Sequence, residues 1–165
     1  MMKPIQFLLL STVMLMAVSC RKPAEYPLEP IIAYDTLRVL QYTNPVPGQI
    51  TDSVVIDIDF TDGDGNLGVA KNAAKDDTTN YNFFYTPYRL QKGKWVKVIE
   101  LYSKIPTLNS TSKAVPLKGT ISADITDAFY LFRKRDTMRV EIYVKDNAGN
   151  ISNTVTSQLF SGLQD

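Results

Sequence analysis

Hydrophobic and polar residues alternate at every second position in two stretches of the chain. The apolar members are Val54, Ile56, Ile58 and Phe60 in the first stretch, and Met138, Val140, Ile142 and Val144 in the second. Aspartates stand between them in the first stretch, and charged residues and a tyrosine in the second. Because successive side chains of a strand point to opposite faces, the pattern predicts two strands, each with one buried and one solvent-facing side.

Other apolar and aromatic runs predict further strands, which are separated by residues typical of turns. These expected strands span residues 32–40, 82–90, 94–101, 119–125 and 151–160. One short helix is expected around residues 127–133. About seven short strands with so little helix predict an all-β protein built as an antiparallel β-sandwich.

Residues 1–20 have the composition of an export signal. Lys3 gives a positive start, residues 5–18 are mostly apolar, and small residues precede Cys20. The stretch is short for a membrane-spanning helix, so we interpret it as a signal peptide. Its end resembles the lipobox of bacterial lipoproteins, which implies a covalent lipid on the Cys20 thiol and cleavage just before it. The alternative is a plain secretory signal with an incidental cysteine.

Three prolines in residues 21–30 are typical of an extended spacer, so we expect a tether there and one domain over residues 31–165. Removing Lys3 with the signal leaves basic and acidic side chains equal in number. Such a chain offers no excess positive charge for nucleic-acid binding. The chain also contains no histidine, which excludes Ser-His and Cys-His nucleophile pairs.

Two expected loops are rich in oxygen ligands. The first reads Asp59-Phe60-Thr61-Asp62-Gly63-Asp64-Gly65-Asn66-Leu67-Gly68, and the second reads Asp146-Asn147-Ala148-Gly149-Asn150. These motifs resemble those of immunoglobulin-like domains in lipoproteins of the Bacteroidota. The resemblance implies an immunoglobulin-like or fibronectin-III-like sandwich. In that strand order the two loops emerge at the same end.

Carboxylate and amide oxygens at that end favour Ca²⁺, which takes six to eight oxygen ligands in a flexible loop. The candidate ligands are Asp59, Asp62, Asp64, Asn66 and Asp146, and Asn147 could supply a further oxygen ligand. The first loop lacks the glycine and the glutamate that an EF-hand requires later in its loop. The alternative is ordinary turn chemistry, for which Asp, Asn and Gly are the usual residues.

An aromatic run lies on one of the expected strands. Tyr81, Phe83, Tyr85 and Tyr88, together with Trp95 near the next turn, are candidates for a platform that stacks on sugar rings. Aromatic residues are equally common in strands for packing against the core.

We therefore expect a lipid-anchored cell-envelope protein that acts as a non-catalytic binding or structural module. No catalytic motif is found, and we expect no enzymatic activity. The residue after Cys20 is not the Asp that retains some lipoproteins at the inner membrane, which favours the outer membrane. The start of the tether is a poor match to the acidic signal for surface export, which favours the periplasmic face. Expected partners are the membrane and an envelope protein or glycan.

Overall fold

The structure is a computed structural model that describes residues 25–43, 50–69, 80–111, 113–125 and 131–163. The predicted signal peptide, Cys20 and the first residues of the tether lie outside these ranges, as does most of the predicted helix over residues 127–133. No helix is assigned in the described part of the chain, and residues 131–133 are not helical. None of the described residues therefore belongs to a helix that could span a membrane.

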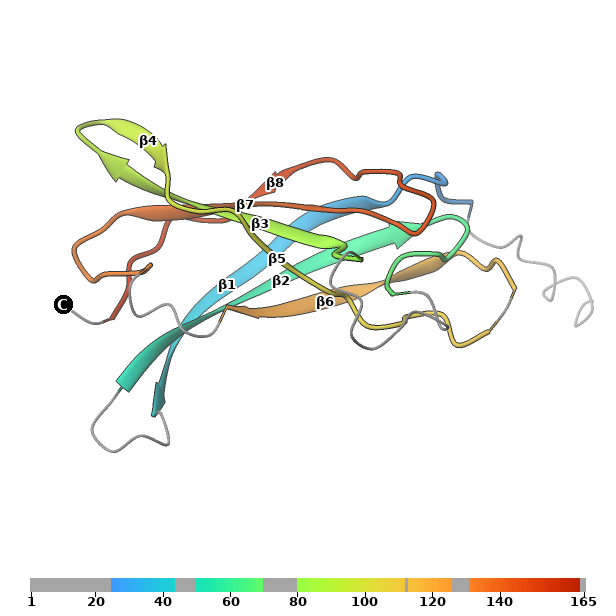
Figure 1. Cartoon of the computed structure of the whole chain (residues 1–165), viewed down its shortest axis with the longest axis horizontal. Helices are drawn as coiled ribbons and strands as arrows, with labels where there is room; N and C mark the ends of the chain where they lie inside the picture. The colour runs from blue at the N-terminus through green and yellow to red at the C-terminus, as the bar shows by residue number, and fades with distance from the viewer. Residues whose placement is uncertain (1–24, 44–49, 70–79, 112, 126–130, 164–165) are drawn as a thin grey trace, which may run out of the picture.

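Within the described ranges, eight strands form two antiparallel sheets (Figure 1). The first sheet has the order β1-β2-β6 and the second has the order β4-β3-β7-β8, with β5 paired to the first part of β3. The strands are β1 (Ile31–Thr43), β2 (Ile50–Asp62), β3 (Phe83–Gln91), β4 (Lys94–Lys97), β5 (Leu101–Ser103), β6 (Leu117–Ile125), β7 (Met138–Val144) and β8 (Val155–Thr156). The chain is thus all-β, as predicted, with the open sandwich arrangement of an immunoglobulin-like fold.

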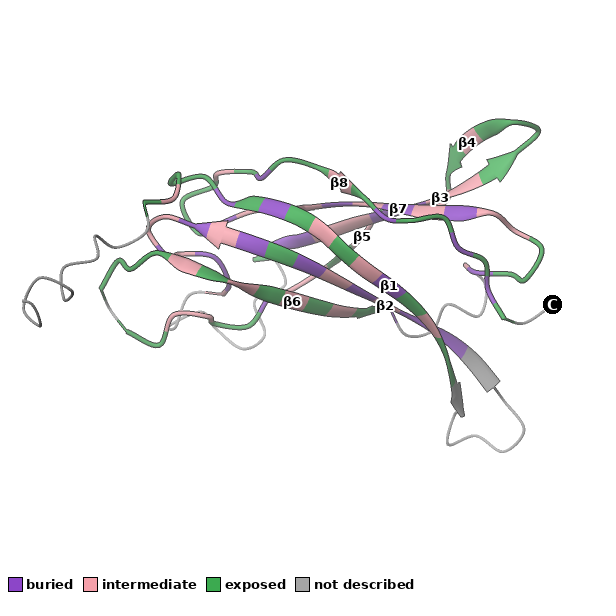
Figure 2. Ribbon diagram, turned by 180° about the vertical axis from the view of Figure 1, so that it is seen from behind, coloured by how far each residue is buried: buried purple, intermediate pink, exposed green. Residues whose placement is uncertain are grey.

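The predicted alternation places the core between the two sheets. Along β2 and β7, the four apolar residues that define each alternating stretch are all buried. Figure 2 shows the same alternation of buried and exposed positions along β1 and β2. Each fully buried aliphatic or aromatic side chain contributes about 1.5–3 kcal/mol relative to exposure, so these two strands supply much of the folding free energy.

The last predicted strand, over residues 151–160, is continuous over only two residues, as β8, with isolated bridges at Ile151 and Phe160. Serine side chains take part of the hydrogen bonding along this edge. The backbone N–H groups of Val140 and Val144 donate to the hydroxyls of Ser157 and Ser152, at 2.9 and 3.0 Å. Because a side-chain oxygen replaces a backbone carbonyl at these positions, the regular ladder is interrupted. The predicted strand over 94–101 is likewise divided, into β4 and β5.

Candidate metal centre at the apex loops

The loop after β2 and the loop after β7 meet at one end of the sandwich, as the strand order predicts. We call the described parts of these two loops, residues 63–69 and 145–150, the apex. The side-chain amide of Asn147 donates hydrogen bonds to the backbone oxygens of Asn66, at 2.6 Å, and Gly68, at 2.8 Å. The first loop is therefore attached directly to the second, although about eighty residues separate them in sequence.

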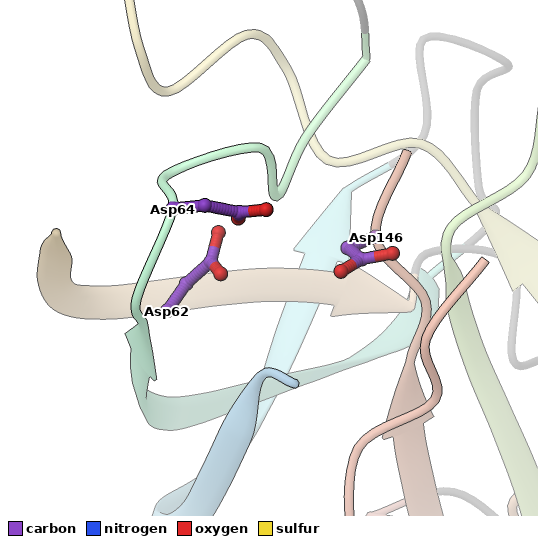
Figure 3. Close-up of side chains that lie close together, drawn as sticks. All are labelled: Asp62, Asp64 and Asp146. Carbon is purple, nitrogen blue, oxygen red and sulfur yellow. The ribbon is translucent and has the colours of Figure 1, made fainter. Parts of the chain in front are cut away.

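Three carboxylates converge at this junction, and we call Asp62, Asp64 and Asp146 the apex aspartates. One oxygen from each lies within 4.8 Å of one from each of the others. Asp62 ends β2, Asp64 follows in the same loop, and Asp146 reaches in from the loop after β7 (Figure 3). Asp62 and Asp146 are buried, and Asp64 is half-buried. Two loops that are distant in sequence therefore contribute to one cluster.

Each apex aspartate is oriented by local hydrogen bonds. The Asp62 Oδ2 atom accepts the backbone N–H of Leu67 at 2.7 Å, and Asp64 accepts the side-chain amide of Asn66 at 2.7 Å. Asp146 accepts the backbone N–H and the side-chain amide of Asn150, both at 2.8 Å. These are turn contacts of the kind that Asp and Asn commonly make. They also hold the carboxylate oxygens in place. Because each oxygen has a second lone pair, it can still bind a further partner.

Two oxygen atoms in the cluster are buried without a hydrogen-bond donor. They are Oδ1 of Asp62 and Oδ1 of Asn66, and the Asp62 side chain has no exposed area. Within the described residues, no Lys or Arg forms an ion pair with any apex aspartate. A buried, unpartnered carboxylate oxygen is costly unless a proton or a cation satisfies it.

The electrostatics of Asp62 reflect this environment. Burial raises the pKa of its carboxyl, and the charges of Asp64 and Asp146 raise the pKa further. The hydrogen bond from the Leu67 N–H acts in the opposite direction, but burial is the largest cause. In the absence of a cation the site therefore favours a proton on Asp62, and a bound cation would compete with that proton.

Glycines allow the first loop to approach its neighbours. Gly68 has a φ of 99°, and a Cβ at this position would lie 2.4 Å from the backbone oxygen of Pro106. Gly65 has a φ of 70°, and a Cβ there would lie 2.1 Å from the backbone oxygen of Val115. Both positions combine a left-handed backbone with a close contact, so only glycine fits without rearrangement.

The donor set fits a hard cation. Asp62, Asp64 and Asp146 supply carboxylates and Asn66 supplies the unpartnered amide oxygen, so every available ligand is oxygen. Oxygen-only sites suit Ca²⁺ and Mg²⁺, whereas zinc sites use histidine or cysteine. The cluster of three aspartates could hold a metal ion. Asn147, which we expected to supply an oxygen ligand, instead uses its amide to join the loops.

Asp59 does not join this cluster. It is exposed on the outer face of β2, where its Oδ1 accepts the hydroxyl of Thr120 on β6 at 2.6 Å. The strand period explains the difference: Asp59 lies between the buried Ile58 and Phe60, whereas Asp62 has the same parity as these core residues. A ligand set chosen by closeness in sequence alone therefore included one residue from the opposite face.

The residues of the predicted aromatic platform do not share one face, because odd and even positions of a strand point to opposite sides of the sheet. Phe83 is 1% exposed and lies in the core, and Tyr85 packs against the core, so neither forms part of a surface. Tyr88 and Trp95 lie on the outer face, on either side of the Arg139 guanidinium, which is 5.4 and 4.7 Å from their ring centroids. The ring of Tyr81 packs 4.2 Å from that of Tyr102.

The outer face also carries aromatic residues that the sequence reasoning missed. Phe84 is paired across the sheet with Tyr102 on β5 and with Tyr143 on β7. The rings of Phe84 and Tyr143 stack at 4.7 Å with an angle of 7° between their planes. Parity alone identifies Phe84 as the partner of Tyr88 on this face, but only the strand register brings Tyr102 and Tyr143 to it.

No family model, curated protein or solved structure matches the chain.

Proposed function

We propose that the protein is a non-catalytic module of the cell envelope whose apex binds Ca²⁺. The observation that carries the proposal is the buried Asp62 oxygen, which faces two further carboxylates and has no donor of its own. Ca²⁺ bonds to carboxylate and amide oxygens at about 2.3–2.6 Å and tolerates irregular geometry, with water completing its shell. Asp62, Asp64, Asn66 and Asp146 would be its ligands from the chain.

The ion would act by connecting the two apex loops. Asp62 ends β2 and Asp64 follows in the next loop, whereas Asp146 belongs to the loop after β7. Shared ligation would add to the Asn147 hydrogen bonds and offset the repulsion among the three carboxylates. The expected result is a rigid apex that presents a defined surface to a partner, with no chemical step.

The proposal includes attachment to the membrane through a lipid on Cys20, with the domain at the outer membrane and facing the periplasm. It is supported by the lipobox-like end of residues 1–20. Mass spectrometry of the chain purified from bacterial membranes tests this part directly. We expect the mature chain to begin at Cys20 and to carry a diacylglycerol group, and an unmodified thiol would contradict the anchor.

Thermal melting of the unlipidated chain from residue 21 onward tests the metal site. In excess EGTA, followed by a Ca²⁺ titration, we expect a saturable rise in melting temperature. A ligand that binds only the folded state stabilises by about 2.7 kcal/mol at a hundredfold excess over its dissociation constant. That corresponds to a shift of several degrees in a domain of this size.

Two double variants make a matched comparison, since each removes two negative charges from β2 or its loop. Asp62→Asn with Asp64→Asn should abolish the shift. Asp57→Asn with Asp59→Asn should retain it, because both of these carboxylates lie on the outer face with partners of their own. An equal loss in both double variants would mean that the shift reflects overall charge rather than a site at the apex.

A second candidate function is glycan binding on the outer face of the second sheet. The cross-strand row of Tyr102, Phe84 and Tyr143 favours it, because Tyr102 is 53% exposed and aromatic rings stack on sugar rings. Calorimetry against a panel of soluble oligosaccharides would show binding that is lost in Tyr102→Ala or Trp95→Ala. Tyr85→Phe is the control, since Tyr85 packs against the core. No heat with any glycan would count against this function.

A further inference from the structure

The described chain begins against the apex itself. The backbone N–H of Gly63 donates to the backbone oxygen of Pro27 at 2.8 Å. A Cβ at Gly63 would lie 2.3 Å from the backbone oxygen of Tyr26, so the two segments are in close contact. Gly63 stands between Asp62 and Asp64 in the chain. The described part of the tether is therefore held beside the candidate metal centre.

The length of the remaining chain limits how far this end can be from a lipid on Cys20. Five residues lie between Cys20 and Tyr26, so the chain takes six steps from one Cα atom to the other. An extended chain spans at most about 3.6 Å per residue, so the distance from Cys20 to Tyr26 is at most about 22 Å. Figure 1 shows the first described residues and both apex loops at one end of the sandwich, with β4 and the C-terminal residues at the other. A lipid on Cys20 would keep the apex end near the bilayer.

The surface of this end suits a headgroup layer. Leu28, at the contact with the loop, is 60% exposed, and Ile151, just after the second loop, is 59% exposed. Lys113 lines a hollow of 290 Å³ at the apex, and Lys145 lines another of 210 Å³. Exposed apolar residues such as Leu159 occur at the opposite end as well, so the position of the tether is what distinguishes the two ends.

We propose that the apex end of the sandwich lies against the lipid surface that holds the anchor, with Leu28 and Ile151 entering the headgroup layer. The opposite end, with β4 and Leu159, then faces away from the membrane. This inference rests on the proposed lipid anchor and extends it, because an anchor alone would allow the domain to take any orientation. Amphipathic protein surfaces enter the interface by about 5–10 Å, which is enough for two side chains at the edge of a loop.

The apex aspartates would make the contact between the apex and the lipid headgroups dependent on Ca²⁺. Three carboxylates near the surface would repel anionic headgroups, and a Ca²⁺ ion between them would reduce that repulsion by cancelling most of their charge. The lysines beside the hollows carry the charge that anionic headgroups attract. Contact of the apex with anionic lipid should therefore increase when Ca²⁺ is added.

Two tryptophan variants of the full chain, purified in lipidated form, test the orientation. In a Trp95→Phe background, Ile151→Trp reports on the apex end and Leu159→Trp reports on the opposite end. The two positions have nearly equal exposure, 59% and 60%, and Phe160 next to Leu159 pairs with Met138 at the far end of β7. The chains are reconstituted into vesicles of phosphatidylethanolamine and phosphatidylglycerol that contain brominated lipid, which quenches tryptophan fluorescence at short range.

We expect several-fold stronger quenching for Ile151→Trp than for Leu159→Trp, and a further increase with Ca²⁺ for Ile151→Trp alone. Equal quenching in a chain whose Cys20 lipid is confirmed by mass spectrometry would overturn the orientation while leaving the anchor in place. A chain without lipid that does not float with the vesicles would overturn both. Stronger quenching that does not respond to Ca²⁺ would support the orientation and overturn its dependence on the cation.

A second measurement avoids substitutions. Hydrogen exchange of the wild-type lipidated chain in the same vesicles is compared with that of the unlipidated chain in solution. We expect added protection at residues 147–151 and none at residues 91–94, the turn between β3 and β4. Added protection confined to residues 91–94 would reverse the proposed orientation.

Discussion

Two sets of aspartates in this fold have different environments. The apex aspartates are at least half-buried, converge on one another and include an oxygen without a donor. Asp57 and Asp59 on β2 and Asp124 on β6, which we call the face aspartates, lie on the outer face of the first sheet. Asp57, Asp59, Asp62 and Asp64 share a residue type and one stretch of chain, so their surroundings alone account for the difference.

Each face aspartate is satisfied by a hydroxyl from the neighbouring strand. Ser122 donates to Asp57 at 2.5 Å, and Asp57 also accepts a hydrogen bond from the Arg38 guanidinium at 2.8 Å. Thr120 donates to Asp59, and Ser53 donates to Asp124. Solvent and cross-strand hydrogen bonds thus stabilise these charges where they stand. A carboxylate that already has such partners gains little from a metal ion, whereas Asp62 keeps a buried oxygen without a donor.

The largest expected effect is that of Asp62→Asn on the free energy of unfolding, and its sign reverses when Ca²⁺ is added. In EGTA, Asp62→Asn should raise the free energy of unfolding by about 1 kcal/mol, because a buried charge is removed and the new amide can donate to a neighbouring carboxylate. In saturating Ca²⁺ the same variant should be less stable than the wild type by about 2 kcal/mol, since the bound ion no longer contributes. Urea unfolding under both conditions measures the reversal.

Asp59→Asn is the control for this reversal. Its side-chain oxygen still accepts the Thr120 hydroxyl, so the free energy of unfolding should change by less than about 0.5 kcal/mol in either condition. A change of sign with Ca²⁺ in this variant would abolish the distinction between the two sets.

The pH dependence of the metal-free protein should show an intermediate effect. Because burial raises the pKa of Asp62, the folded chain holds this proton more tightly than the unfolded chain does. The stability that the protonated Asp62 carboxyl contributes is therefore fully present below the ordinary carboxyl pKa of about 4. It is lost as the pH rises through the raised pKa of Asp62 in the folded chain. Unfolding in EGTA across this range should show a fall in the wild type that is smaller in Asp62→Asn. Identical pH profiles for the wild type and Asp62→Asn would mean that ionising Asp62 does not lower the free energy of unfolding.

The smallest effect is expected from the best-connected face aspartate. A double-mutant cycle with Arg38→Ala and Asp57→Ala should give a coupling free energy of about 0.2–1 kcal/mol, which is usual for an exposed ion pair. The coupling should decrease at high salt and should not respond to Ca²⁺. A coupling free energy above that range, or one that depends on Ca²⁺, would mean that Asp57 behaves like an apex aspartate and not like an exposed partner in an ion pair.

Much of the fold could be predicted because the strand period is a local property. The alternation around Ile56 and Val140 predicted two core strands, and both are buried as expected. The last strand could not be predicted correctly, because its pairing is replaced in part by the hydroxyls of Ser152 and Ser157. Nothing in the local pattern distinguishes a serine that faces solvent from one that accepts a backbone N–H of the next strand.

The candidate site was predicted in part. Asp62, Asp64 and Asp146 were identified from turn-like motifs in loops that an immunoglobulin-like order brings together, and the structure places them within 4.8 Å of one another. Asp59 was included because it is close in sequence, and Phe84 was missed because Phe83 beside it was selected. Both errors concern which face of a strand a residue occupies, which depends on register.

The sequence by itself determined the all-β class, the alternating core strands and the residue types from which a metal centre could be built, because these depend on neighbours along the chain. Only the tertiary structure decided which aspartates share a site, which aromatic rings form the outer face, and that Tyr26 and Pro27 lie against the apex. These contacts join residues that are distant in sequence. They depend on the pairing of strands and the packing of loops, which no local pattern specifies.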